Sequence, residues 1–354
     1  MKKVLILTAS YGHGHNTAAA HLKDYRISKW AQVEVLDLVE FAGIFGKGVQ
    51  KVYMTANEKA PYLWEKTFDI FDSHFARDLM FSIRPIMYQT RFNEFLRKFK
   101  PDLVISTFPF WLWFLKKYFR VHPKAFKVGI VVTDAINIHQ TWYLEEQRVD
   151  KRFVIDQFSR DAVLKKFKVS PEKVIVSFFP LPSQKFKNKT HISGKNILIM
   201  LSVAIDEDYI WELLELLSER EGVNILILRW RTQEFFDELK EEYQDASHIS
   251  FYDFLPLVDE FGKKDRIYIG KPGGATMSEA IATDTPMIVP AYYPGQEEGN
   301  LKLLEMIETG FYVPDPTLTY TFIKYGDWDK LLPNFKKIKN PNSLEIIYKS
   351  LLEK

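Results

Sequence analysis

The stretch from Ile267 to Asn300 constrains the fold more than any other part of the chain. It reads IYIGKPGGATMSEAIATDTPMIVPAYYPGQEEGN. A short apolar run at 267–269 leads into a glycine turn, a helical pattern follows, and a second apolar run at 287–289 ends before Pro290. Strand, glycine turn, helix and strand form the unit from which parallel sheets are built. The stretch therefore predicts a parallel α/β sheet.

The polar residues of this stretch predict a nucleotide site. Gly273 and Gly274 precede the helix, and we expect them to take positive φ and to let a ligand approach the backbone. The free N–H groups and partial positive charge of a helix N-terminus suit a phosphate. Thr276 and Ser278 are expected to donate hydroxyls there, and Glu279, one turn inside the helix, to accept from two sugar hydroxyls.

A second polar cluster, PGQEEGN at 294–300, follows the next strand. It places the amide and carboxyl groups of Gln296, Glu297 and Asn300 outside the carboxyl end of the sheet, where open α/β sheets bind ligands. We therefore predict a nucleotide diphosphate on the helix and a sugar on this loop. The alternative is an ordinary βαβ turn followed by a polar loop, because paired glycines before a helix are common.

The first residues of the chain repeat the pattern of strand, glycine loop and helix. The apolar run Lys3–Thr8 is followed by ASYGHGHNTAAA and a helical stretch. Gly12 and Gly14 permit a tight turn that presents His15 at the start of the helix. The positive end of a helix disfavours the imidazolium, so we expect a neutral histidine that can serve as a general base. The alternative is a histidine that caps the helix or packs in the core.

These motifs resemble those of one glycosyltransferase family. It contains the monogalactosyldiacylglycerol synthases and the bacterial processive diacylglycerol glucosyltransferases, and the lipid II-forming N-acetylglucosaminyl transferase is a more distant relative. The residues that carry the resemblance are Gly12, Gly14, His15, Ala18, Ala19, Thr133, Asp134, His139, Trp142, Lys271, Pro272, Gly273, Gly274, Thr276, Glu279, Ala280, Pro286, Pro294, Gly295, Gln296, Glu297 and Asn300.

The resemblance implies the GT-B fold, in which two Rossmann-like, doubly wound α/β domains face across a cleft. It implies that Glu279 holds the ribose of UDP, that the loop at 296–300 holds the donor sugar, and that His15 removes the proton of the acceptor hydroxyl. Asp134 follows a predicted strand at 126–132 and would orient or polarise His15. Alternatively, His139 and Trp142, which lie further along that loop, shape the acceptor pocket.

We therefore predict the following site residues. The catalytic residues are His15 and Asp134, and the residues that bind the donor are Gly14, Lys271, Gly273, Gly274, Thr276, Glu279, Gln296, Glu297 and Asn300. No metal ligand is expected, because no cluster of metal-ligating residues is visible in the sequence, and no cofactor is expected besides the UDP-sugar substrate. Backbone dipoles, hydroxyls and a cation such as Arg229, Arg231 or Lys271 would neutralise the leaving group.

Charge and composition divide the chain. Residues 1–180 carry a net charge of +10 and the remainder −8, which leaves +2 for the whole. We predict an N-terminal acceptor domain at 1–180, a C-terminal UDP-sugar domain at 195–340, and a last helix at 341–354 that packs back on the first domain. The proline-rich and basic segment 178–190 is the predicted linker.

The basic half predicts an anionic partner surface. Between residues 41 and 100, aromatic residues alternate with Arg and Lys at helical spacing, which is typical either of a core or of a helix on an anionic membrane. The N-terminus lacks the apolar core of a signal peptide, and no apolar run approaches the ~18 residues of a membrane span. We expect a peripheral protein at the cytoplasmic face of the membrane, and the absence of cysteine fits a reducing compartment.

One segment departs from the family pattern. Relatives have a glycine-rich phosphate loop after the first strand of the second domain, whereas residues 202–206 here read SVAID. The predicted function is transfer of a hexose from a UDP-sugar to a lipid hydroxyl, with diacylglycerol as the acceptor. The alternatives are a polyprenyl-linked acceptor, a UDP-sugar sensor without turnover, which the missing glycines favour, and nucleic-acid binding, which only the basic half suggests and which we do not expect.

Overall fold

The computed structural model describes residues 2–29, 31–59, 86–143, 147–230, 233–263, 265–295 and 297–352. It divides into two compact units, Met1–Ser183 with Asn340–Lys354, and Gln184–Lys339. The chain therefore passes between the units within the segment 178–190 that we predicted as a linker, and again after Lys339. Much of the aromatic segment at 41–100 lies outside the described residues.

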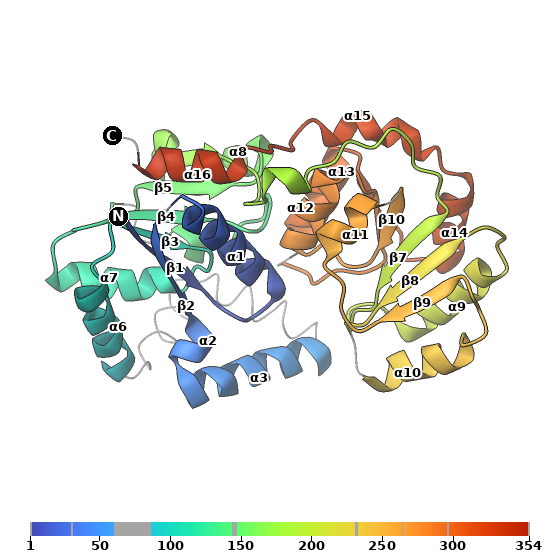
Figure 1. The fold of residues 1–354 in the computed structure, drawn as a ribbon, viewed down its shortest axis with the longest axis horizontal. Helices are drawn as coiled ribbons and strands as arrows, with labels where there is room; N and C mark the ends of the chain where they lie inside the picture. Colours follow the sequence, from blue (N-terminus) through green and yellow to red (C-terminus); the bar gives the residue numbers. More distant parts are fainter. Residues whose placement is uncertain are drawn as a thin grey trace. The chain divides into compact units, whose positions relative to one another are not determined.

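The first unit is built on six parallel strands in the order β2-β1-β3-β4-β5-β6 (Figure 1). Its helices and strands are β1 (Lys3–Thr8), α1 (His13–Ile27), β2 (Gln32–Asp37), α2 (Leu38–Phe41), α3 (Gly43–Lys59), α6 (Ile86–Phe99), β3 (Leu103–Ser106), α7 (Trp111–Val121), β4 (Lys127–Val131), β5 (Lys151–Val154), α8 (Gln157–Lys166), β6 (Val174–Val176) and α16 (Ser343–Leu352).

Continuous apolar runs form the strands of this unit because helices cover both faces of the sheet. The four central residues of β1, from Val4 to Leu7, are all fully buried. On one face, α16 lies beside α1, and the Tyr348 hydroxyl donates to the Leu22 carbonyl at 2.9 Å. Leu351 of α16 packs onto Gly129 of β4, where a Cβ atom would stand 2.6 Å from the Leu351 side chain. The last helix thus completes the core of the first unit.

The second unit also has six parallel strands, in the order β12-β11-β10-β7-β8-β9. Its helices and strands are β7 (Asn196–Met200), α9 (Glu207–Ser218), β8 (Asn224–Leu228), α10 (Gln233–Glu242), β9 (Ile249–Tyr252), α11 (Leu257–Lys263), β10 (Arg266–Ile269), α12 (Gly274–Ala282), β11 (Met287–Val289), α13 (Glu298–Met306), β12 (Gly310–Tyr312), α14 (Pro316–Tyr325) and α15 (Leu332–Phe335). The predicted class, two Rossmann-like doubly wound α/β units, is confirmed.

The strand orders locate a ligand-binding crevice in each unit. In a doubly wound sheet, ligands bind outside the carboxyl ends of the strands, where the strand order reverses. The order reverses between β1 and β3 in the first unit and between β7 and β10 in the second. The loop that leads to His15 follows β1, and the turn that contains Gly273 follows β10. Both predicted motifs therefore lie at switch points.

A helix that spans a bilayer needs about 20 predominantly apolar residues. Among the described residues, every helix is too short or too polar to cross a membrane.

Candidate active site

The loop between β1 and α1 brings His15 to the carboxyl edge of the first sheet. Because α1 begins at His13, the His15 side chain projects from the first turn of the helix. The Thr107 hydroxyl donates to the His15 backbone carbonyl at 3.1 Å, and the Thr133 hydroxyl lies 3.2 Å from the imidazole Nδ1. The two threonines lie just past the ends of β3 and β4. Neighbouring strands of the sheet therefore hold the histidine in place.

Aromatic side chains surround the His15 imidazole. The ring centroid lies 5.0 Å from that of Phe108, in an edge-on arrangement, and 6.1 Å from that of Trp142. Tyr11, from the glycine loop, stacks on Phe108 with a centroid distance of 5.5 Å. Phe108 and Trp142 are themselves buried. The histidine is thus half-buried in a largely apolar environment.

Burial determines the charge of His15. It lowers the pKa of the imidazole from 6.5 to about 4, and a hydrogen bond with the backbone of Thr107 opposes part of this shift. A cation in an apolar pocket loses its hydration, which disfavours the protonated form. The expectation of a neutral histidine therefore holds, but its main cause is burial among aromatic rings rather than the helix terminus. A neutral imidazole at neutral pH has a nitrogen lone pair that can accept a proton.

Asp134 and Gly14 complete the predicted residues of this unit. Asp134 is half-buried and directly follows Thr133, whose hydroxyl contacts the His15 imidazole. Its role in orienting His15 stays a prediction, and Thr133 is a contact that we did not predict. The Thr-Asp pair at the end of a predicted strand was the available signal. Gly14 lies within the first turn of α1, beside His15.

The turn after β10 forms the candidate phosphate site of the second unit. Gly270 is required because a Cβ atom there would lie 2.4 Å from the hydroxyl of the buried Tyr268. Gly273 is the N-cap residue of α12 with a φ of −60°, and Gly274 begins the helix. The predicted positive φ at these glycines is therefore wrong, because an N-cap takes extended backbone angles. The first turn of α12 holds no acidic residue and no side-chain cap, which leaves its N–H groups open to an anion.

Four of the predicted donor-binding residues lie together at this turn. The Lys271 ammonium forms an ion pair with the Glu297 carboxylate, whose other oxygen accepts from the Tyr293 backbone N–H at 3.0 Å. A Cβ atom placed on Gly273 would lie 3.4 Å from Lys271 Nζ, 3.6 Å from Glu297 Oε1 and 3.9 Å from Thr276 Oγ1. The structure therefore brings lysine, glutamate and threonine around Gly273. The charge of Lys271 is already balanced by Glu297.

The interior of α12 holds two further predicted residues. Glu279 is 7% exposed, and burial raises the pKa of its carboxyl from 4.5 to about 8. The nearby Asp259 carboxylate raises this pKa further, whereas the Lys185 ammonium lowers it. Lys185 and Asp259 form an ion pair of 2.5 Å. The Ser278 hydroxyl donates to the Gly274 carbonyl at 2.8 Å inside the helix, so the prediction that it faces the ligand is wrong.

The remaining predicted residues belong to the loop after β11. Asn300 is fully buried in the first turn of α13, and Gln296 lies outside the described residues. Gly295 takes a φ of +76°. Arg229 forms an exposed ion pair of 2.6 Å with Asp253, and Arg231 also lies outside the described residues.

The loop at 202–206, which lacks glycine, follows β7 and lies on the other side of the switch point between β7 and β10. The Ser202 hydroxyl accepts from the Ala204 N–H at 3.3 Å, and Asp206 caps α9 by accepting from the Asp208 N–H at 2.9 Å. Glu207 and Asp208 add negative charge to the first turn of α9. A capped and acidic helix terminus repels a diphosphate. The phosphate contacts of this unit are therefore expected from α12.

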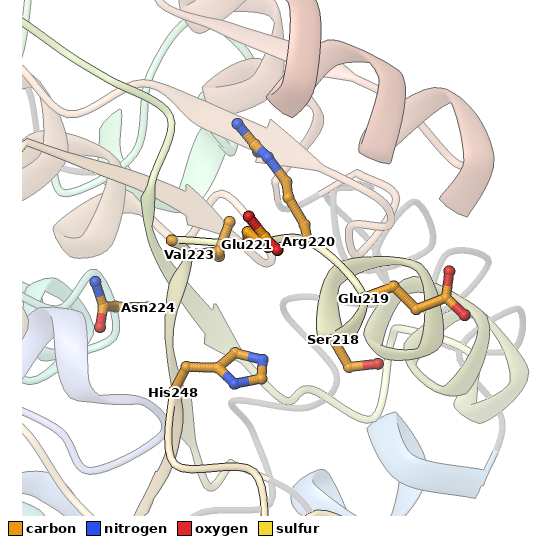
Figure 2. A pocket seen from close by; sticks show the side chains of 8 residues that line it. Ser218, Glu219, Arg220, Glu221, Val223, Asn224 and His248 are labelled. Carbon is orange, nitrogen blue, oxygen red and sulfur yellow. The ribbon is translucent and has the colours of Figure 1, made fainter.

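A different pocket lies at the amino ends of β8 and β9. It has a volume of about 380 Å³ and is lined by Ser218, Glu219, Arg220, Glu221, Gly222, Val223, Asn224 and His248 (Figure 2). These residues come from the end of α9 and from the turns that lead into the two strands. Nucleotides bind at the carboxyl ends of parallel strands. This pocket is therefore a poor candidate for the donor site.

Comparison with known proteins shows which family the chain resembles. Residues 15–180 match the family model described as monogalactosyldiacylglycerol (MGDG) synthase. The processive diacylglycerol beta-glucosyltransferase of Bacillus licheniformis is 26% identical over 99% of this chain and 95% of its own length. The enzyme of the same name from Bacillus subtilis is 24% identical with the same coverage. The chain is therefore similar to this family over its first half by the family model and over almost its whole length by these relatives. The resemblance predicted from the sequence is thereby confirmed.

Solved structures with the GT-B fold also match the chain. MurG of Acinetobacter baumannii matches with a TM-score of 0.62 at 15% identity, over 100% of both chains. A glycosyltransferase of Rickettsia africae matches with a TM-score of 0.55 at 16% identity, over 99% of both chains. The UDP-GlcNAc 2-epimerase of Neisseria meningitidis, bound to UDP-GlcNAc, has a TM-score of 0.60 at 14% identity over 99% of this chain and 100% of its own. The predicted GT-B class is confirmed.

Proposed function

We propose that this protein is a glycosyltransferase that moves a hexose from a UDP-sugar to the free hydroxyl of diacylglycerol, and so makes a membrane glycolipid. The relatives named above are diacylglycerol glucosyltransferases, and their similarity to this chain extends over almost its whole length. The observation that carries the proposal is the neutral His15, held at the β1–β3 switch point by threonines that follow two other strands. A neutral imidazole at the carboxyl edge of a doubly wound sheet suits proton removal from an alcohol.

The reaction we propose is a displacement at the anomeric carbon. The acceptor hydroxyl oxygen forms a bond to this carbon while the bond from the carbon to the diphosphate oxygen breaks, and UDP leaves. The hydroxyl proton passes to the His15 imidazole. Because the alcohol becomes strongly acidic only as the new bond forms, a base with a pKa of about 4 accepts the proton late in this step.

The α12 terminus is the proposed site of the departing diphosphate. Its uncapped N–H groups and the partial positive charge of the helix would stabilise the developing negative charge. The Thr276 hydroxyl beside Gly273 would donate a further hydrogen bond. Lys271 is paired with Glu297, so we propose that the pair positions the donor sugar rather than neutralising the phosphate. Glu279 would hold the ribose from within the helix, as the family resemblance implies.

We also propose that the first unit contacts an anionic membrane through α3. Three apolar residues of this helix face solvent, Ile44 with 93%, Phe45 with 52% and Val49 with 41% exposure. The exposed Lys47 and Lys51 lie on the same helix. Apolar insertion together with basic charge provides the two signals that stable peripheral attachment requires. The membrane would be the one that holds the acceptor, at its cytoplasmic face.

No divalent metal takes part in the proposed reaction, because backbone dipoles and hydroxyls serve the leaving group. The test is to add excess EDTA to the transfer assay, with the rate expected to stay the same. Loss of activity that Mg²⁺ restores would refute this part of the proposal.

The proposed activity is tested with purified protein, liposomes that contain anionic lipid and diacylglycerol, and several radiolabelled UDP-hexoses. The wild type should form labelled glycolipid, and His15→Ala should form it about 10²- to 10⁴-fold more slowly. His122→Ala, which changes an exposed histidine of the same unit, is the matched control and should keep the wild-type rate. Equal rates for His15→Ala and wild type would refute the role of His15.

A UDP-sugar sensor without turnover is the second candidate. The glycine-free loop at 202–206 and the acidic first turn of α9 favour it. Phosphate contacts were expected from this loop and from the start of α12, and only those of α12 remain. It predicts UDP-sugar binding by calorimetry with no transfer to any lipid. A polyprenyl phosphate offered in the same assay separates the remaining acceptor class.

A further inference from the structure

The helix α3 has an inner side that contacts the loop before His15. Gly46 lies against α2, and a Cβ atom at this position would stand only 2.3 Å from the Val39 carbonyl oxygen. One turn further along α3, the Gln50 side-chain amide donates to the Ser10 backbone carbonyl. The three residues between these two, Lys47, Gly48 and Val49, face solvent. The same two turns of α3 thus carry the proposed lipid surface on one side and contact the loop that follows β1 on the other.

A second route reaches Ser10 through α2. The Asp37 carboxylate caps this helix by accepting from the Val39 N–H at 2.8 Å. Its other oxygen accepts from the Ser10 hydroxyl at 2.7 Å. The backbone of Ser10 is therefore held by a residue of α3, and its side chain by the residue that caps α2, the helix against which α3 packs. A hydrogen bond to a carboxylate is among the stronger contacts of a protein.

The same serine contacts the first turn of α1. The Asn16 side-chain amide donates to the Ser10 hydroxyl oxygen at 2.8 Å. The Asn16 side-chain oxygen Oδ1 accepts from the Thr8 hydroxyl at 2.8 Å. Asn16 is the residue next to His15, and Ser10 is the last residue before Tyr11, which stacks on Phe108. A continuous hydrogen-bonded network therefore runs from α3 to the turn that carries His15.

We propose that this network positions His15 in response to lipid: contact of α3 with an anionic bilayer is passed through Gln50 and Asp37 to Ser10, and from Ser10 to Asn16 and His15. The occupant of the exposed side of α3 is an anionic bilayer because Lys47 and Lys51 accompany its apolar residues. The inference rests on the membrane contact of the proposed function and names residues that would couple this contact to catalysis. Ser10, Gln50 and Asn16 are positioning residues, since none of them is expected to touch the reacting atoms.

The first test follows the His15 ring directly and needs no turnover. In protein labelled with ¹³C-histidine, the His15 signal is assigned from its loss in His15→Gln and then recorded with and without nanodiscs of anionic lipid. The wild-type signal should shift with nanodiscs, whereas the shift should be lost in Ser10→Ala and Gln50→Met and restored in Ser10→Thr. Gly48→Ala, on the open side of α3, should behave as wild type.

The second test measures the ratio of transfer rates on anionic vesicles and on neutral detergent micelles. Ser10→Ala and Gln50→Met should lower the ratio about fivefold, the effect of one lost hydrogen bond, through kcat rather than the KM for UDP-sugar. Their sedimentation with vesicles should equal that of the wild type. Ser10→Thr should restore the ratio.

Three results would overturn the inference. They are an unchanged ratio of transfer rates on vesicles and micelles in the variants, loss of vesicle binding by Gln50→Met, and a wild-type His15 signal that does not shift when nanodiscs are added. If the protein transfers sugar to no acceptor, the proposed function is refuted. If its His15 signal still shifts with nanodiscs and Ser10→Ala abolishes the shift, this inference stands. The two failures are therefore distinguishable.

Discussion

The buried carboxyl of Glu279 predicts how the stability of the second unit depends on pH. Its pKa is raised from 4.5 to about 8 in the folded state, chiefly by burial. The unfolded chain therefore loses this proton at a lower pH than the native state. Below about pH 4.5 both states are protonated and Glu279 contributes nothing. As pH rises toward 8 the native state binds more protons than the unfolded state, so the free energy of unfolding falls.

The expected size follows from the shift. One pKa unit corresponds to about 1.4 kcal/mol, so raising the pH from 5 to 8 should cost the second unit about 3 kcal/mol through Glu279 alone. Glu279→Gln keeps the shape of the side chain but cannot ionise. At pH 5 the free energy of unfolding of the variant should differ from that of the wild type only by a constant offset. By pH 8 it should have risen by about 3 kcal/mol relative to the wild type.

The assay is urea unfolding followed by hydrogen exchange of peptides from α12, because these report on the second unit. Glu298→Gln, which removes an exposed carboxylate of α13, is the matched control and should run parallel to the wild type. If the difference between wild type and Glu279→Gln is the same at pH 5 and pH 8, the raised pKa is wrong.

Three further outcomes are expected. Lys271→Met leaves the buried Glu297 carboxylate without its cation and should lower the free energy of unfolding by about 3 kcal/mol, whereas adding Glu297→Leu should recover most of the loss in urea titrations. Gly46→Ala should cost about 1–3 kcal/mol because its Cβ would meet the Val39 carbonyl, and Gly48→Ala, with open space around it, should not lower the melting temperature. Transfer activity should survive EDTA, and a requirement for Mg²⁺ would contradict the proposed leaving-group stabilisation.

The architecture could be predicted from the sequence because its signals are local. Apolar runs of strand length alternate with helical patterns, and such alternation specifies doubly wound parallel sheets. The position of His15 in the first turn of α1, and of Gly273 and Gly274 at the start of α12, also followed from residues near in sequence. The backbone angle of Gly273 did not, since a glycine pair suits either a left-handed turn or an N-cap.

The chemical state of the site was decided by tertiary structure. The imidazole of His15 is neutral because Phe108 and Trp142, each far along the chain, fold around it. Glu279 holds its proton because α12 is buried, with Asp259 nearby. Periodicity and turn residues report interactions over a few residues, whereas burial and charge depend on groups that only the folded sheet brings together. The sequence by itself therefore determined which elements carry the site, and the fold determined which of their side chains are charged, paired or accessible.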